Sequence, residues 1–222
     1  MDDTEFEAAL IAAAFGLAGN HGWRRVSVAA AARHGALDLA RARRRFRSVP
    51  AIILDFGRQA DAAALDGAME DGTVKDRLFD LLMRRIDFHQ RHRAGVIALM
   101  RLAPLDPLLA MLLARATVQS MGWMLESAEI SARGARGGLR ARGLVAVWAW
   151  TIRAWLRDDS EDLATTMAAL DVALTRADQI ARSLSMQQRD AEPPIDAPFT
   201  DDAATDDHTP LGPPFDDPER PD

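Results

Sequence analysis

Residues 27–50 read SVAAAARHGALDLARARRRFRSVP, and this stretch decides how the rest of the chain is interpreted. Ser27 is a helix-capping residue type, so a short helix is predicted over residues 28–34. The helix is predicted to end at Gly35, because glycine adopts a positive φ at little cost. A second short helix is predicted over residues 39–46. Two such helices joined by a tight turn form the helix-turn-helix of many DNA-binding proteins, although this spacing alone is common.

Arginine dominates this stretch. Residues 20–50 contain eight arginines and one acid, Asp38, whereas the whole chain has a net charge of −6. Asp38 is predicted to cap the second helix, where its carboxylate suits the positive helix start. Arg41 and Arg45 are one helical turn apart. A guanidinium group donates several hydrogen bonds in a fixed plane, so a cluster of arginines attracts phosphate.

The rest of the sequence predicts helices and no strands, so the fold class is all-α. The first helix should follow a Thr4 cap, and Ser48 with Pro50 should open the fourth helix. Further starts are predicted at the caps Thr73 and Asp106. The predicted helices cover residues 4–19, 28–34, 39–46, 50–64, 73–90, 94–103, 107–128, 139–157 and 160–187. Loops are predicted at residues 66–72, as a domain boundary, and at the glycine-rich residues 131–138.

The composition predicts a cytoplasmic protein. The 222 residues are 48% hydrophobic, enough to bury a core, and cysteine is absent, which excludes disulfides and thiolate chemistry. The acidic start lacks the pattern of a signal peptide, and no run of about 20 apolar residues predicts a membrane span. Residues 189–222 carry a net charge of −9 and eight of the eleven prolines. This segment is predicted to be a disordered tail.

The helix-turn-helix resembles that of the TetR family of one-component transcriptional regulators. The resemblance covers about residues 5–57 at the motif level and the helical layout to about residue 187. The matching residues are Phe15, the His21-Gly22-Trp23 turn, Val26, Ser27, Val28, Ala31, Ala32, Leu37, Asp38 and Phe46. The chain departs from the family at residues 40–43, where glycine-threonine-leucine-tyrosine is usual, at Val49, which replaces a lysine, and at Gly35, which stands one place early.

The resemblance implies a DNA-binding head over residues 1–57, with a linking helix to about residue 65, and a ligand-binding and dimerisation body over residues 73–188. Operator DNA would be bound by Ser27, Leu39, Arg41, Arg43, Arg44, Arg45 and Arg47. A small apolar ligand or lipid would be bound by Met100, Met111, Met121, Trp123, Trp148 and Trp155. In the last helix, apolar residues recur at alternating spacings of four and three residues. Such a narrow apolar stripe, called the seam below, suits one partner helix and predicts a homodimer. Its residues are Leu163, Met167, Leu170, Leu174, Ala177 and Ala181.

Two other functions are open. The C-terminal half also resembles the ubiquinone-biosynthesis lipid-binding accessory family, which shares the TetR-like fold. The matching residues are Gly22-Trp23, Gly122-Trp123, Trp148 to Asp158, Ser160 and Thr166. In that alternative the helix-turn-helix is vestigial. An enzyme is not expected, because no nucleophile, base and metal set converges. No cofactor or metal site is predicted.

Overall fold

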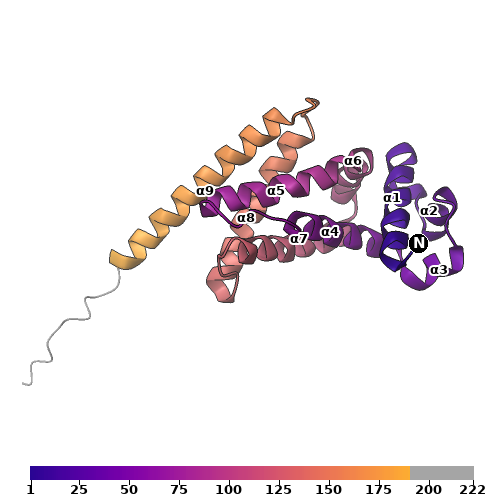
Figure 1. Ribbon diagram of the computed structural model, residues 1–222, viewed down its shortest axis with the longest axis horizontal. Helices are drawn as coiled ribbons and strands as arrows, with labels where there is room; N and C mark the ends of the chain where they lie inside the picture. The colour runs from indigo at the N-terminus through magenta and orange to yellow at the C-terminus, as the bar shows by residue number, and fades with distance from the viewer. Residues whose placement is uncertain (191–222) are drawn as a thin grey trace, which may run out of the picture. The chain divides into compact units, whose positions relative to one another are not determined.

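The computed structural model describes residues 1–190, and it describes their side chains to residue 183. These residues form α-helices and two 3-10 turns without any strand, which confirms the all-α prediction (Figure 1). The predicted tail lies outside the described residues, apart from the two residues that end the last helix. Residues 1–184 make one compact unit. The predicted head and body therefore belong to the same unit.

The head is built from three helices and one 3-10 turn. These are α1 (Asp3–His21), η1 (Trp23–Arg25), α2 (Val28–His34) and α3 (Leu39–Arg45). Gly22 ends α1, which runs two residues beyond the predicted end, and the cap is Asp2 rather than Thr4. Asp2 is favoured because its carboxylate accepts from the Glu5 amide at 2.7 Å while Glu5 accepts from the Asp2 amide at 2.9 Å.

The turn between α2 and α3 differs from the prediction. Gly35 has φ −85°, and the positive φ, +50°, falls on Ala36. Gly35 is needed for a different reason, because a Cβ there would lie 3.0 Å from the Ala13 Cβ and 3.2 Å from a Leu37 methyl carbon. The close approach of α2 to α1 therefore favours glycine at position 35. The left-handed backbone conformation is left to an alanine, which tolerates it less well.

The linking helix α4 (Val49–Leu65) starts at the Ser48 cap, as predicted. Its inner side chains Ile52, Ile53, Phe56 and Ala60 are buried, and Phe56 stacks on Phe15 of α1 with ring centroids 3.9 Å apart. The predicted loop at residues 66–72 then follows.

Head and body meet where α1 crosses α6 (Arg93–Leu102) (Figure 1). The crossing is close because two glycines face it. A Cβ on Gly95 would lie 2.5 Å from the Phe15 carbonyl oxygen, and one on Gly19 would lie 2.7 Å from the Ala94 Cβ. Trp23 closes the joint, since its indole Nε1 donates to the Gly95 carbonyl oxygen at 3.0 Å. Trp23 is buried, and it packs on the body as well as on the head core.

The body continues with α5 (Val74–Gln90), η2 (Ala103–Leu105), α7 (Pro107–Ser127), α8 (Gly134–Trp155) and α9 (Ala164–Asp190). Thr73 and Asp106 cap α5 and α7 as predicted. Helix α8 begins five residues before the predicted start. Gly134 has φ +67° and opens the helix, and Gly137 packs directly on the Ala132 backbone.

The corner between α8 and α9 is fixed by one buried carboxylate. The predicted Ser160 start is wrong, because Ser160 binds the Asp158 carboxylate with both its amide and its hydroxyl. The amide and hydroxyl of Thr166 also donate to Asp158, each at 2.7 Å. The hydrogen bonds from Ser160, followed by those from Thr166, lower the pKa of Asp158 to about 2. The regular turns of α9 begin only at Ala164.

By length and composition α7 could cross a membrane, since its most apolar 18-residue window has a mean hydropathy of 1.3. Only 28% of that window is buried. A single helix of this kind is weak evidence, because core helices of soluble proteins pass the same test.

Candidate nucleic-acid interface

The inner face of α3 packs on the head core through Ala42, and Phe46 continues that face just beyond the helix. Both residues are buried. The 3.6-residue repeat then directs Arg43, Arg44 and Arg47 away from the core, and all three are exposed. None of the three forms an ion pair within the part of the chain whose side chains are described. They are the free cations of α3 and its C-terminal end.

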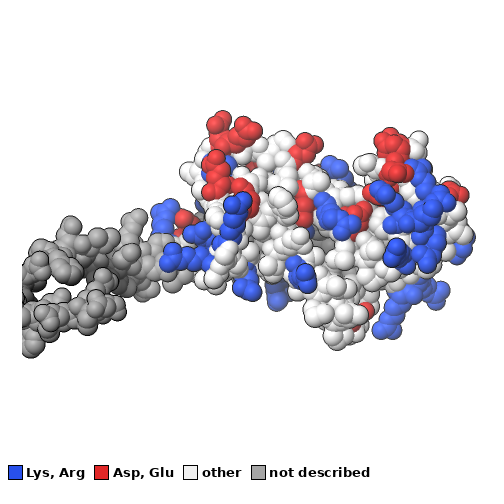
Figure 2. Space-filling view, turned by 90° about the horizontal axis from the view of Figure 1, so that it is seen from below, with Lys and Arg blue, Asp and Glu red and all other residues white. Residues whose placement is uncertain are grey.

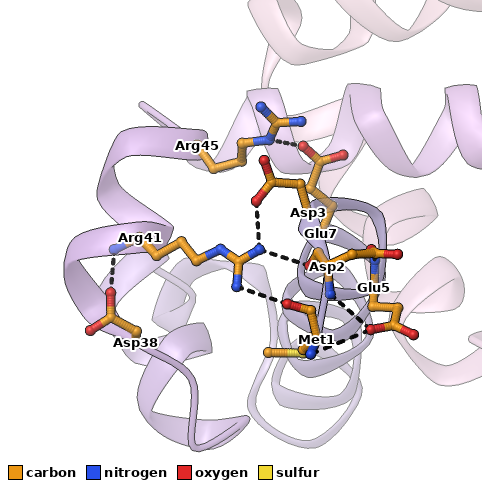
Figure 3. A network of polar contacts seen from close by, with 8 residues as sticks. All are labelled: Met1, Asp2, Asp3, Glu5, Glu7, Asp38, Arg41 and Arg45. Carbon is orange, nitrogen blue, oxygen red and sulfur yellow. Dashed lines mark hydrogen bonds and ion pairs between the residues drawn. The ribbon is translucent and has the colours of Figure 1, made fainter.

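Arg41 is turned back onto α1 (Figure 3). Its Nη2 donates to the Asp3 carboxylate at 2.5 Å and to the Asp2 carbonyl oxygen at 2.7 Å. Its Nη1 donates to the Met1 carbonyl oxygen at 3.3 Å, and the guanidinium carbon lies 4.4 Å from the Phe6 ring centroid. The pKa of Asp3 is lowered, first by the hydrogen bond from Arg41 and then by its charge. Arg41 therefore links α3 to the first turn of α1.

Arg45 makes a parallel contact one turn later, because its Nε donates to the Glu7 carboxylate (Figure 3). Sequence reasoning missed both pairs. The charge pattern of residues 20–50 left the partners of these arginines open. The available signal was the acidic run at Asp2, Asp3, Glu5 and Glu7, opposite in charge to the arginines of α3.

The positive surface extends beyond α3. Figure 2 shows Lys and Arg side chains crowded over the part of the molecule that holds α1, α2 and α3, with acids beside them. Arg24, Arg25 and Arg33 are exposed there. Ser27 is also exposed, and its Oγ accepts from the Ala30 amide at 3.0 Å as the α2 cap. Leu39 begins α3 and is 47% exposed.

The predicted ligand residues do not come together in one cavity. Met121, Trp148 and Trp155 are buried and Met100 is half-buried. Met111 and Trp123 are 63% and 59% exposed, so the prediction that they line the interior is wrong. They lie on the outer face of α7, whose inner face carries Met121 and Met124.

Two surface pockets are present in the described part of the chain, and none of the six predicted ligand residues lines either of them. A pocket of about 780 Å³ lies beside the loop after α4 and is lined by Met69, Asp71, Gly72, Asp76, Phe79, Asp80 and Met83. A pocket of about 400 Å³ lies at the joint of head and body, with Trp23, Arg24, Ile53 and Leu105 among its walls.

The mainly apolar interior of the body also contains a buried polar network. Arg85 donates to the Asp61 carboxylate and to the Ser120 hydroxyl oxygen, and its guanidinium carbon lies 4.9 Å from the Trp148 ring centroid. Burial lowers the pKa of Arg85 and raises that of Asp61. His89 lies one turn along α5, with its Nδ1 2.7 Å from the Arg85 carbonyl oxygen. Burial, followed by the Arg85 charge, lowers the pKa of His89 to about 3, so its imidazole is neutral.

The predicted dimer seam is used inside the protomer. Leu163, Leu170 and Leu174 are buried in the core of their own chain. Lys75 of α5 pairs with Asp171 of α9 at 2.7 Å, on the same side. Of the other seam residues, Met167 and Ala177 are half-buried and Ala181 is exposed. The three leucines of the four–three pattern thus pack within the protomer, whereas Met167, Ala177 and Ala181 remain partly or fully accessible.

No cluster of three or more His, Asp or Glu side chains suited to a metal ion occurs among the described residues. No known family model matches the sequence. No curated protein matches it either.

Solved structures, in contrast, share the fold. A TetR transcriptional regulator from Nitrosomonas europaea is similar with a TM-score of 0.65 and 22% identity, covering 79% of this chain and 99% of the other. A TetR-family regulator from Streptomyces coelicolor has a TM-score of 0.55 and 20% identity, over 90% and 94% of the two chains. The SmeT–triclosan complex has a TM-score of 0.51 and 14% identity, over 78% and 91%. The chain therefore has the fold of the TetR-family transcriptional regulators.

Proposed function

We propose that this protein is a DNA-binding transcriptional regulator whose head contacts DNA through the outward arginines of α3 and its C-terminal end. The observation that carries the proposal is the set Arg43, Arg44 and Arg47, which are exposed and not ion-paired on a helix-turn-helix. Arginine suits this role because its planar donors match both phosphate oxygens and the guanine edge. Arg24, Arg25 and Arg33 extend the same positive surface and would contact the DNA backbone.

Such a head works as one of a pair, because two heads bind half-sites about 34 Å apart on DNA. We assign the dimer interface to the outer faces of α8 and α9 instead of the predicted seam. Trp150, Val172 and Ile180 are 52%, 44% and 61% exposed there. The variant Trp150→Arg should give a folded monomer in sedimentation, since it places a charge in an apolar interface. Met111→Arg, a matched change on exposed α7, should leave the dimer intact.

We also propose that the protein is a repressor and that a small ligand controls its binding to DNA. The larger pocket supports it, because about 780 Å³ is within the range of small-molecule sites and three of its walls are Met69, Phe79 and Met83. Of its three carboxylates, Asp76 accepts from Thr73 and Asp80 pairs with Arg84, so the apolar walls are the part of the pocket that favours a ligand. The similar fold of SmeT, solved with triclosan, supports an apolar ligand in general.

The test is selection of duplexes from a random library at about 0.1 M salt, followed by titration of the selected site over a range of salt. Wild type should prefer one sequence, and log K should fall with log salt by about 0.9 for each phosphate contact. Arg43→Gln, Arg44→Gln and Arg47→Gln together should abolish the preference. Arg115→Gln, an exposed arginine of α7 outside both the head and the proposed dimer interface, is the control. A wild type that selects no sequence would refute the regulator.

The alternative is the lipid-binding accessory protein. The solved structures favour the regulator, since the similar proteins from Nitrosomonas europaea and Streptomyces coelicolor are both transcriptional regulators. Extraction of isoprenoid lipid from vesicles, together with failure to select DNA, would reverse this preference.

A further inference from the structure

We propose that Asp3 and Glu7 of α1 set the DNA affinity of the head by withholding Arg41 and Arg45 from phosphate. This inference rests on the proposed DNA binding and concerns which of the five arginines at residues 41–47 take part. It assigns the two acids a positioning role. The reasons are the contacts of Arg41, the contact of Arg45 and the charge that α1 presents beside them (Figure 3).

Arg41 is held by more than an ion pair. Its guanidinium donors are directed to two backbone carbonyl oxygens as well as to the Asp3 carboxylate, and one of its faces covers the Phe6 ring. A phosphate approaching Arg41 would have to displace several acceptors at once. It would also meet the charge of Asp3, whose lowered pKa keeps it ionised at neutral pH.

Arg45 is held by Glu7, which is the less exposed partner, with 20% of its side chain exposed against 48% for Arg45. Arg41 and Arg45 are one turn apart, and so are Asp3 and Glu7. The two pairs therefore form one ladder between α1 and α3. On a helical wheel Arg41 lies about 60° from Arg44, so a freed Arg41 would border the outward face. Its long side chain could then reach the same duplex.

The neighbouring Glu5 provides a matched control. It belongs to the same acidic turn, but its carboxylate accepts from the Asp2 amide and touches neither arginine. Glu5→Gln removes one negative charge from the same neighbourhood without freeing an arginine. Comparing Glu5→Gln with the variants at Asp3 and Glu7 therefore separates two causes of tighter DNA binding: the general loss of negative charge and the release of the arginines.

The experiment measures the binding of full-length protein to one selected duplex across salt concentrations. Asp3→Asn with Glu7→Gln should steepen the log–log salt slope by about 1.8, or about 0.9 for each freed arginine. Affinity at about 50 mM salt should rise on the order of tenfold per arginine. Each single variant should give half of the change in slope. Glu5→Gln should raise affinity slightly and leave the slope near that of wild type.

A second comparison tests the arginines directly. In wild type, Arg41→Gln with Arg45→Gln should leave the slope unchanged, whereas in the Asp3→Asn, Glu7→Gln background it should remove the gain. Helical content and the unfolding midpoint identify any variant that fails to fold, and the single variants then carry the test. Equal slopes for Glu5→Gln and the double variant would overturn this inference alone. If wild type selects no DNA, the proposed function fails and this inference fails with it.

Discussion

The head and the body each contain arginine–carboxylate pairs, but the pairs differ in their exposure to water. Arg45 and Glu7 of the head have 48% and 20% of their side chains exposed, whereas Arg85 and Asp61 of the body have 6% and 17%. An exposed pair is screened by water and contributes little to stability. In the body pair the Arg85 charge is enclosed and depends on Asp61 in place of water. The head pair can therefore be altered to tune binding, while the body pair must stay intact for the fold.

Breaking the body pair should produce the largest effect. Asp61→Asn leaves Arg85 charged and nearly enclosed, and it should lower the free energy of unfolding by about 3–5 kcal/mol. Urea denaturation followed by circular dichroism measures the change. Replacing both partners with apolar residues, as Asp61→Leu with Arg85→Met, should recover most of the loss. A single variant that loses under about 1 kcal/mol would show that water reaches this pair after all.

The histidine beside that pair predicts the next largest effect, on the pH dependence of stability. The pKa of His89 is about 3 in the folded protein and about 6.5 when unfolded. The unfolded chain thus binds an additional proton between these values, and stability falls as pH drops below about 6.5. By pH 4.5 the loss should be about 3 kcal/mol.

His89→Phe should remove this component, because Phe cannot be protonated and the site is surrounded by aromatic rings. The comparison is the difference in unfolding free energy between pH 7 and pH 4.5 in the two proteins. His92 and the carboxylates contribute equally to both, so they cancel. Equal pH dependence in wild type and variant would contradict a neutral, buried His89.

Capping residues and apolar periodicity predicted the fold well. Ser27, Asp38, Ser48, Thr73 and Asp106 each cap the helix expected, because capping depends only on a few neighbouring residues. The start of α8 was mispredicted because Gly134 and Gly137 were taken as loop residues. At Gly137 the absent side chain instead leaves room for the Ala132 backbone.

The predicted sites depended on which face of each helix is covered, and periodicity does not give this. The seam at Leu170 and Leu174 has the right spacing for a partner helix, yet it packs on its own protomer. Trp123 was expected inside because tryptophan is usually buried, but α7 turns it outward. The arginine cluster was found from charge alone. Its division into free and paired members depends on contacts between residues 38 positions apart.

A smaller effect on the free energy of unfolding is expected at the turn between α2 and α3, where the backbone is strained. Ala36 adopts φ +50°, a region that costs a non-glycine residue about 1–2 kcal/mol. Ala36→Gly removes this strain. It also makes the unfolded chain more flexible, which lowers the free energy of unfolding by about 0.4–1 kcal/mol, so the net increase in the free energy of unfolding should be about 0.5–1 kcal/mol. Thermal unfolding measures it. Gly35→Ala is the opposing control and should destabilise, because its Cβ would lie 3.0 Å from that of Ala13.

The smallest stability effect is expected at the head pair. Glu7→Gln removes one partner of Arg45 where both side chains retain contact with water, so the unfolding free energy should fall by only about 0.2–1 kcal/mol. Added salt should shrink the difference further, because the charges of an exposed pair are screened. The Asp61→Asn loss should change little with salt. Urea titrations of wild type and both variants at about 0.05 and 0.5 M salt would measure this contrast. A salt-independent loss of several kcal/mol at Glu7 would mean that the ladder between α1 and α3 holds the head together, and that its arginines could not be released without unfolding it.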